Sequence, residues 1–310
     1  MRASLFAALA LLGLASCDIL VPVQPVPVPP ARPAELGPVE QSEESKAIAR
    51  HFARVQADLV ARGLMRRDGG GPDVPFTTRN LVDNFVHIAL YDEYVSHGGM
   101  LIARPTPSRL RRWEQPIRLG LTFGDSIPQA QRREDAAGIA SYARRLSRLS
   151  GLPITMSRPE QANFHVLVLN EDERRSFGPR LRQIEPGIDS TALNAIVNMP
   201  RSTFCLVFAF SRGNSSSYSR AVAVIRGEHP DLMRQSCVHE ELAQGLGLAN
   251  DSPAARPSIF NDDEEFALLT EHDELLLKIL YDPRLKPGMT PSQARPIVQE
   301  IAAELMGGAG

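Results

Sequence analysis

The sequence predicts an α+β protein in which helices precede, interrupt and follow the strands of one mixed, twisted sheet. Residues 117–123 alternate between apolar and polar side chains, as a half-buried strand does. Residues 204–210 form a continuous apolar run, which is typical of a buried strand. Residues 134–149 repeat apolar side chains at helical spacing, and Pro230 followed by Asp231 marks the start of another helix.

The composition is that of an ordinary globular protein. The chain has 310 residues, of which 43% are hydrophobic and 23% are charged, and its net charge is −2. This length is enough for one large domain with appendages or for two small domains. Because the arginines alternate with acidic residues and no basic excess exists, we expect no nucleic-acid partner.

The amino terminus has the features of a lipoprotein signal peptide over residues 1–17. An apolar core, too short to span a bilayer, leads into Leu14-Ala15-Ser16-Cys17. This tetrapeptide resembles the cleavage and lipidation site of bacterial lipoproteins, and the alternative is a plain signal peptide with an incidental cysteine. Asp18 resembles the signal that retains lipoproteins at the inner membrane. We therefore expect a periplasmic protein that an acylated Cys17 anchors to the lipid bilayer.

Four further segments come after the signal peptide. Residues 18–41 are predicted to form an extended linker, because Pro and Val alternate from Val21 to Pro30. Residues 42–104 are predicted to form an N-terminal helical region, with one helix from Ser42 and a second over residues 79–97. The main domain is predicted over residues 105–285, and a C-terminal helix and tail over residues 286–310.

Within the main domain the predicted order is strand, helix, strands, site helix, turn and last helix. Beyond the strands named above, residues 154–156, 164–169 and 221–225 are expected as strands. Residues 171–184 are expected as a short charged helix or a loop. Cys205 lies in a predicted strand and Cys237 in the site helix. Because the periplasm is oxidising, we expect these two cysteines to form a disulfide, with two separate buried thiols as the alternative.

The stretch 236–252 (SCVHEELAQGLGLANDS) carries the candidate site. His239-Glu240 suggests an H-E-x-x-H zinc motif, but Ala243 occupies the position of the second histidine. A frame shifted by one residue places Glu240 and Gln244 at the ligand positions and Glu241 at the position of the general base. At about 100° per residue, these three side chains share one side of the helix, whereas His239 points elsewhere.

This shifted frame, continued through residue 281, resembles the active-site segment of matrixin-like metzincins. Gly247 matches the glycine of the long zinc motif, and Asn250 or Asp251 matches the third ligand position. Ser258-Ile259-Phe260 resembles the turn under the metal, and residues 269–281 resemble the final helix. The three ligand histidines and the turn methionine are absent. The carboxy-terminal half also resembles a family of uncharacterised bacterial lipoproteins.

The resemblance implies a metzincin-like zincin domain with a degenerate site. Its candidate metal ligands are Glu240, Gln244, Asn250 and Asp251, and Glu241 is the candidate general base if the site is active. Because these are oxygen donors, the sequence favours no metal cofactor, with zinc or calcium as the alternative. The acidic run 261–265 could bind calcium, but such a run more often caps a helix or faces solvent.

Two functions remain open from the sequence. The first is a non-catalytic binding or scaffold lipoprotein of the cell envelope, with a peptide or an envelope component as its partner. The second is an atypical metal-dependent peptidase or hydrolase that uses Glu241, and the identity of the ligand residues favours the first. A cell-wall lytic enzyme with Glu241 as its acid is a more distant alternative.

Overall fold

The computed structural model describes residues 39–97 and 100–307. The predicted signal peptide with Cys17, and the predicted linker up to residue 38, lie outside the described residues. Among the described helices, none combines the length and the apolar composition that a membrane-spanning segment requires.

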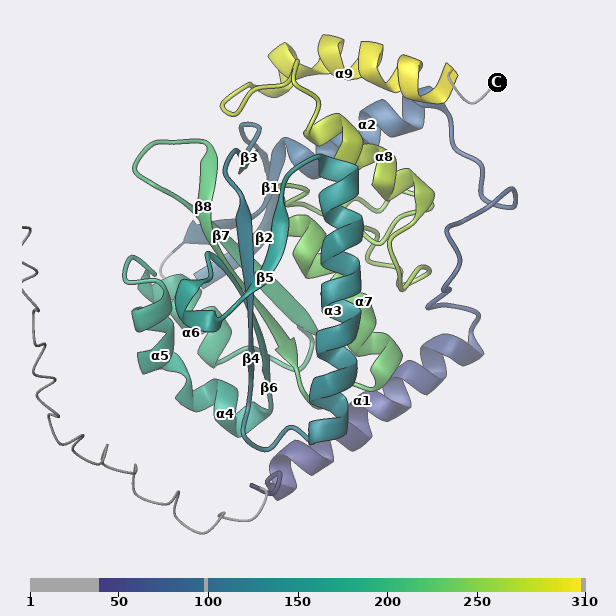
Figure 1. The fold of residues 1–310 in the computed structure, drawn as a ribbon. Coiled ribbons are helices and arrows are strands. Elements are labelled where there is room, and N and C mark those ends of the chain that lie inside the picture. The colour runs from purple at the N-terminus through teal and green to yellow at the C-terminus, as the bar shows by residue number, and fades with distance from the viewer. Residues whose placement is uncertain (1–38, 98–99, 308–310) are drawn as a thin grey trace, which may run out of the picture. The chain divides into compact units, whose positions relative to one another are not determined.

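One six-stranded, mostly parallel sheet forms the centre of the fold (Figure 1). Its strands are β3 (Arg112–Trp113), β4 (Ile117–Phe123), β5 (Ile154–Ser157), β6 (Phe164–Leu169), β7 (Cys205–Ser211) and β8 (Ser217–Arg226). Strands β5, β4, β6 and β8 are parallel neighbours in that order, and the short β3 pairs with the first residues of β8. Strand β7 alone runs antiparallel, along the other side of β8. The α+β class and the mixed sheet predicted from the sequence are thus confirmed.

Nine α-helices lie in the described chain. They are α1 (Glu43–Ala61), α2 (Thr78–Ala89), α3 (Gln129–Ser150), α4 (Glu171–Ser176), α5 (Gly178–Ile184), α6 (Ser190–Val197), α7 (Asp231–Gln244), α8 (Glu271–Leu280) and α9 (Pro291–Gly307). A short 3-10 turn, Pro159–Gln161, precedes β6, and strands β1 (Tyr91–His97) and β2 (Met100–Pro107) form a separate antiparallel hairpin.

The two faces of the sheet are covered by different helices (Figure 1). Val166 and Val168 of β6 point into a large core with α2, α3, α7, α8 and α9. Leu167 and Leu169, which alternate with them, point into a smaller core with α5 and α6. Because both faces are buried, β6 is apolar almost throughout, and so is the segment 221–225 of β8. Helix α1 packs separately against the beginning of α7.

The second predicted helix is shorter than expected, and the hairpin was not predicted. The sequence indicated a helix over residues 79–97, but α2 ends at Ala89 and β1 begins at Tyr91. The apolar helical stripe stops at Ala89, and Tyr91, Tyr94 and Val95 are residue types that strands favour. The N-terminal region is therefore not entirely helical.

Strand β7 also differs from its prediction as a buried strand, because all seven of its residues are partly exposed. It lies at the edge of the sheet, and its side chains alternate between the two cores. A continuous apolar run does not distinguish an edge strand with two covered faces from a central strand.

Residues 171–184 form two helices, and α6 was not predicted.

The described chain forms one compact unit, and its main core does not divide at the predicted boundaries. Residues of α2, from the predicted segment 42–104, and of α9, from segment 286–310, belong to the same core as the sheet and α7. Segments 42–104, 105–285 and 286–310 are therefore not separate folding units within the described residues.

Candidate functional site

Helix α7 is held rigidly at both ends. Asp231 lies in its first turn, and Arg234 makes a buried ion pair with Asp135 of α3 at 2.7 Å. At the other end, the Trp113 indole N–H donates to the Gly245 carbonyl at 2.8 Å. Gly247 then adopts φ +130, and a Cβ there would lie 2.2 Å from the Arg111 carbonyl oxygen, so only glycine fits. These contacts therefore position α7 relative to α3 and the sheet.

A disulfide joins α7 to the edge of the sheet. Cys205, the first residue of β7, is bonded to Cys237 in the middle of α7, with an S–S distance of 2.04 Å and a Cα–Cα distance of 5.8 Å. Since the carboxylates of α7 come three and four residues after Cys237, this bond places the start of β7 beside them.

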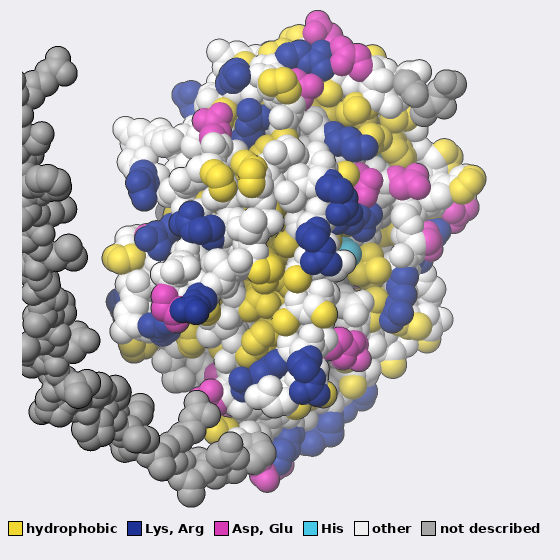
Figure 2. Space-filling view, viewed as in Figure 1, with side chains coloured by type: hydrophobic (Ala, Val, Ile, Leu, Met, Phe, Trp, Pro, Cys, Tyr) yellow, Lys and Arg dark blue, Asp and Glu magenta, His cyan; other side chains and the backbone are white. Residues whose placement is uncertain are grey.

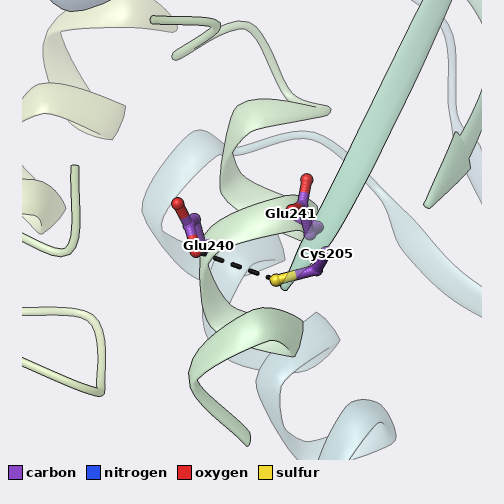
Figure 3. A group of neighbouring side chains, drawn as sticks. All are labelled: Cys205, Glu240 and Glu241. Carbon is purple, nitrogen blue, oxygen red and sulfur yellow. Dashed lines mark hydrogen bonds between the residues drawn. The ribbon is translucent and has the colours of Figure 1, made fainter. Parts of the chain in front are cut away.

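The carboxylates of two consecutive residues of α7 lie close to the sulfur of Cys205 (Figure 3). Carboxylate oxygens of Glu240 and Glu241 and the Cys205 Sγ all lie within 4.8 Å of one another. Asp251, in the loop after α7, acts electrostatically on both glutamates. We refer to Glu240, Glu241 and Asp251 as the α7 acidic cluster.

The α7 acidic cluster contains no basic partner. In the part of the chain that the structure describes, no ion pair joins any of its three carboxyl groups to Arg, Lys or His. Glu241 is only 3% exposed, and its Oε2 has no hydrogen-bond partner among the described residues. Burial raises the pKa of Glu241 well above its ordinary value, and the charges of Asp251 and Glu93 raise it further.

The other two carboxyl groups are shifted in the same direction. Burial, followed by the charges of Glu241 and Asp251, raises the pKa of Glu240. Burial and Glu93 raise the pKa of Asp251, which Gln244 opposes by donating its Nε2–H to Asp251 Oδ1 at 3.1 Å. Within the described residues, this amide is the one side-chain N–H group that donates to the cluster.

The structure gives the remaining predicted ligands different roles. Gln244 positions Asp251 through its amide. Asn250 donates its Nδ2–H to the His87 carbonyl of α2 at 2.9 Å, and its main-chain N–H donates to the Ile88 carbonyl. Asn250 is 2% exposed, and its Oδ1 has no hydrogen-bond partner among the described residues. The loop after α7 is thus tied to α2.

His239, His229 and His272 each contact groups other than the α7 acidic cluster. His239 stacks on Tyr142 with ring centroids 3.9 Å apart, and its Nδ1 accepts the Leu269 N–H at 3.0 Å. Burial lowers the pKa of His239 to about 3. His229 lies against Phe52, and His272 against Asn84 and Phe76. The prediction that His239 points away from Gln244's side of the helix is therefore confirmed.

The predicted turn Ser258-Ile259-Phe260 is buried and tied to the start of α8. Ser258 Oγ donates to Asp273 Oδ1 at 2.6 Å, and the Ile259 N–H donates to Asp273 Oδ2 at 3.1 Å. Thr270 and Asp273 form the capping box of α8. Phe260 is fully buried in the main core, and its carbonyl accepts the Ser252 N–H from the loop after α7. This turn therefore supports the core and links α8 to that loop.

Two acidic residues outside the predicted ligand set act electrostatically on the cluster. Glu93 of β1 raises the pKa of all three members of the cluster, although it is about 150 residues distant in the chain. Glu264, within the acidic run 261–265, also acts on Glu240, and burial raises its own pKa to about 7. Glu265 of the same run pairs instead with Arg66 and Arg256. No spacing in the sequence links Glu93 to α7.

A surface depression lies away from the cluster. A depression of about 700 Å³ is lined by the loop 214–217, Arg109, Glu114 and residues 286–288. These residues include no member of the α7 acidic cluster. On the face that Figure 2 shows, Lys and Arg side chains are spread out instead of gathered in one patch.

The fold and the site together define an α+β protein with an unpaired group of carboxyl side chains at a disulfide-linked edge of the sheet. The chain belongs to the family described as protein of unknown function (DUF2927), which matches residues 78–300. This match begins at α2 and ends in α9, so it covers the sheet, α7 and the acidic cluster. No curated protein matches the chain.

Proposed function

We propose that this protein is a periplasmic lipoprotein, tethered to the inner membrane through Cys17, whose α+β domain binds an extended peptide and lacks zinc-peptidase activity. The observation that carries the proposal is the donor set on α7. The predicted ligand positions hold carboxyl and amide groups, no histidine reaches them within the described chain, and Cys205 is held in a disulfide. A catalytic zinc site normally needs three protein ligands that are mostly histidine.

The proposed relationship to metzincins is supported by the order of the elements. Strand β4, helix α3, strands β5 to β8, helix α7, the buried turn 258–260 and helix α8 succeed one another along the chain. The sequence predicted this order, which is similar to that of a metzincin-like catalytic domain. A fold of this kind carries no activity without the site residues, so the proposed domain is a binding domain.

The proposed peptide site is the outer edge of β7. Within the described residues β7 pairs only with β8, so one side of its backbone has no strand partner. An unpaired edge offers alternating N–H and C=O groups to an incoming strand. The side chains of β7 are apolar up to Ser211 and partly exposed, which suits contact with apolar peptide side chains.

Hydrogen exchange tests this proposal. A peptide selected from a displayed decapeptide library on the full chain is expected to protect the amides of residues 205–211 and to remain intact. The same peptide, N-methylated at alternate residues, is expected to lose binding because it lacks the donors for strand pairing. Protection confined to other elements would contradict the proposed site.

The same experiment addresses the alternative function, a metal-dependent hydrolase with Glu241 as its general base. Glu240 and Glu241 are close enough to share a ligand, which is the observation in favour of that alternative. Burial holds the pKa of Glu241 well above its ordinary value, so less of it is ionised to act as a base. Cleavage of the selected peptide by the wild-type chain, but not by the Glu241→Gln variant, would replace the binding proposal with this alternative.

A further inference from the structure

Two surface depressions adjoin where three loops meet at one end of the sheet (Figure 1). Their volumes are about 700 Å³ and about 520 Å³, and Arg109, Ser215 and Ser216 line both of them. The loops are the segment before β3, the turn between β7 and β8, and the connection from α8 to α9. We refer to the two depressions together as the polar groove. None of its described lining residues belongs to β7 or to the α7 acidic cluster.

Hydrogen bonds hold the three loops of the polar groove against one another. The Leu110 N–H donates to the Met289 carbonyl, and the Gly288 N–H donates to the Leu110 carbonyl, both at 2.8 Å. Ser217 Oγ donates to Glu114 Oε2 at 3.0 Å, and β3 pairs with the first residues of β8. The walls of the groove are therefore tied to one another and to the sheet.

Positive side chains in the polar groove outnumber negative ones. Arg109, Arg111 and Lys286 line it, and among the described lining residues Glu114 is the one acid. Arg111 is paired with Asp92. Within the described chain, no ion pair joins Arg109 or Lys286 to an acidic side chain. The groove therefore holds two uncompensated cations, in a chain whose overall charge is −2.

The remaining lining residues decide which kind of anion suits the polar groove. Most of them carry hydroxyl or amide groups, and these are Ser108, Asn214, Ser215, Ser216, Ser217 and Thr290. Among the described lining residues the apolar side chains are those of prolines, and none is aromatic. Such walls suit the hydroxyl groups of a sugar better than an apolar or planar ligand. Pockets of about 300 to 1,000 Å³ hold drug-sized ligands, so each depression has room for more than a simple inorganic anion.

We propose that the polar groove binds an anionic oligosaccharide, whose carboxylate or phosphate groups contact Arg109 and Lys286. Arg109 lines both depressions, so its guanidinium reaches ligand groups in either one. One of its N–H groups donates to the Gly288 carbonyl at 3.3 Å, which is the one hydrogen bond of this side chain within the described residues. The other N–H groups are thus available to carboxylate or phosphate oxygens, which a guanidinium binds in pairs. The serine hydroxyls bind the sugar hydroxyls.

Titration calorimetry on the full chain in detergent at low salt tests the polar groove. The probes are tetragalacturonate, which carries carboxylates, a phosphorylated mannopentaose, and the uncharged maltotetraose. At least one anionic probe is expected to bind with one molecule per chain, and maltotetraose is expected not to bind. Arg109→Gln and Lys286→Gln are each expected to weaken binding by about tenfold, because each removes a charge-assisted hydrogen bond. Arg54→Gln on α1 and Lys278→Gln on α8, at exposed positions outside the groove, keep the wild-type affinity.

The proposal is overturned if neither anionic probe binds, or if Lys286→Gln keeps the full affinity. The Lys286 side chain makes no hydrogen bond within the described residues, so this variant tests the groove even if Arg109→Gln disturbs the loop at Gly288. Maltotetraose binding as tightly as the anionic probes would also overturn the proposal, because charge would then play no part in recognition. The groove does not depend on the peptide proposal. Loss of oligosaccharide binding in Lys286→Gln with unchanged peptide binding separates the two sites.

Discussion

Two buried carboxyl groups of this fold, those of Glu171 and Glu241, have opposite kinds of charged neighbours. Glu171, at the start of α4, is 4% exposed and contacts Arg174 at 2.6 Å and Arg226 at 2.7 Å. Glu241, in the α7 acidic cluster, is 3% exposed, and the charges that act on it among the described residues are those of Asp251 and Glu93. The degree of burial is nearly the same, so the difference lies in the partners.

The partners reverse the effect of burial on ionisation. Burial raises the pKa of Glu171, but Arg174 and Arg226 outweigh it and the net shift is downward. In the α7 acidic cluster, burial and neighbouring carboxyl groups act in the same direction, and the pKa values rise. A paired buried charge contributes to a defined structure, whereas an unpaired one is a candidate for ligand binding. Substitutions in and around the two groups can test this contrast.

The largest expected effect is at the paired group. Glu171→Gln leaves Arg174 and Arg226, both almost completely buried, without their carboxylate. Removing one partner of a buried ion pair costs about 3 to 5 kcal/mol, so we expect a loss of this size in the free energy of unfolding in urea. Glu300→Gln serves as the control and is expected to change it by less than about 0.5 kcal/mol. A loss below about 1 kcal/mol would show that Glu171 is not essential to the pair.

The next effect concerns the link between β7 and the acidic cluster. Cys205 and Cys237 are 32 residues apart, and a disulfide closing a loop of this size stabilises a fold by about 3 to 4 kcal/mol through the entropy of the unfolded chain. The Cys205→Ala, Cys237→Ala double variant is expected to lose this amount in urea unfolding. The wild type unfolded in excess reductant should give the same value. Equal stability of the oxidised wild type and the double variant would contradict a native disulfide.

A smaller effect is expected from His165, which lies outside both groups. It is 4% exposed, neither of its ring nitrogens has a partner among the described residues, and burial, together with Arg220 and Arg180, lowers its pKa to about 4. Between the unfolded pKa near 6.5 and the folded value, the unfolded chain binds more protons than the folded chain. Stability is therefore full above about pH 6.5 and falls as the pH decreases toward 4.

Urea unfolding at several pH values measures this contribution. Between pH 7 and pH 4, the wild type is expected to lose on the order of 2 kcal/mol more than the His165→Phe variant. If the unfolding free energies of the two proteins depended on pH in the same way, His165 would be excluded as the source of the pH dependence. Because the acidic cluster is intact in both proteins, its own pH dependence cancels in this comparison.

The sequence predicted those features that local periodicity determines. From the helical spacing we correctly predicted that His239 lies on a different side of α7 from Glu240, Glu241 and Gln244. His239 packs against Tyr142. The alternation in residues 117–123 and the apolar run of β6 correctly predicted two strands of the sheet. The disulfide predicted between Cys205 and Cys237 is present in the structure.

The sequence did not predict those features that depend on distant partners. Glu171 and Arg226 are 55 residues apart, and nothing in their spacing shows that they form a buried pair while Glu241 has none. Glu93 acts electrostatically on the α7 acidic cluster only because β1 and β2 form a hairpin. The sequence instead predicted a helix up to residue 97. The edge position of β7 likewise depends on its antiparallel pairing with β8, and hydrophobicity alone does not encode it.

The most direct measurement of the central claim is the unfolding free energy of Glu241→Gln in urea at neutral pH with chelator, beside that of Glu171→Gln. The two carboxyl groups are buried to nearly the same degree, but we expect the same substitution to change the unfolding free energy in opposite directions. Glu241→Gln removes a carboxyl group that other acids repel, so we expect a gain of about 1 kcal/mol, against the loss at Glu171. A loss of more than about 2 kcal/mol at Glu241 would contradict the account, because it would mean that this carboxyl group is paired in the folded protein.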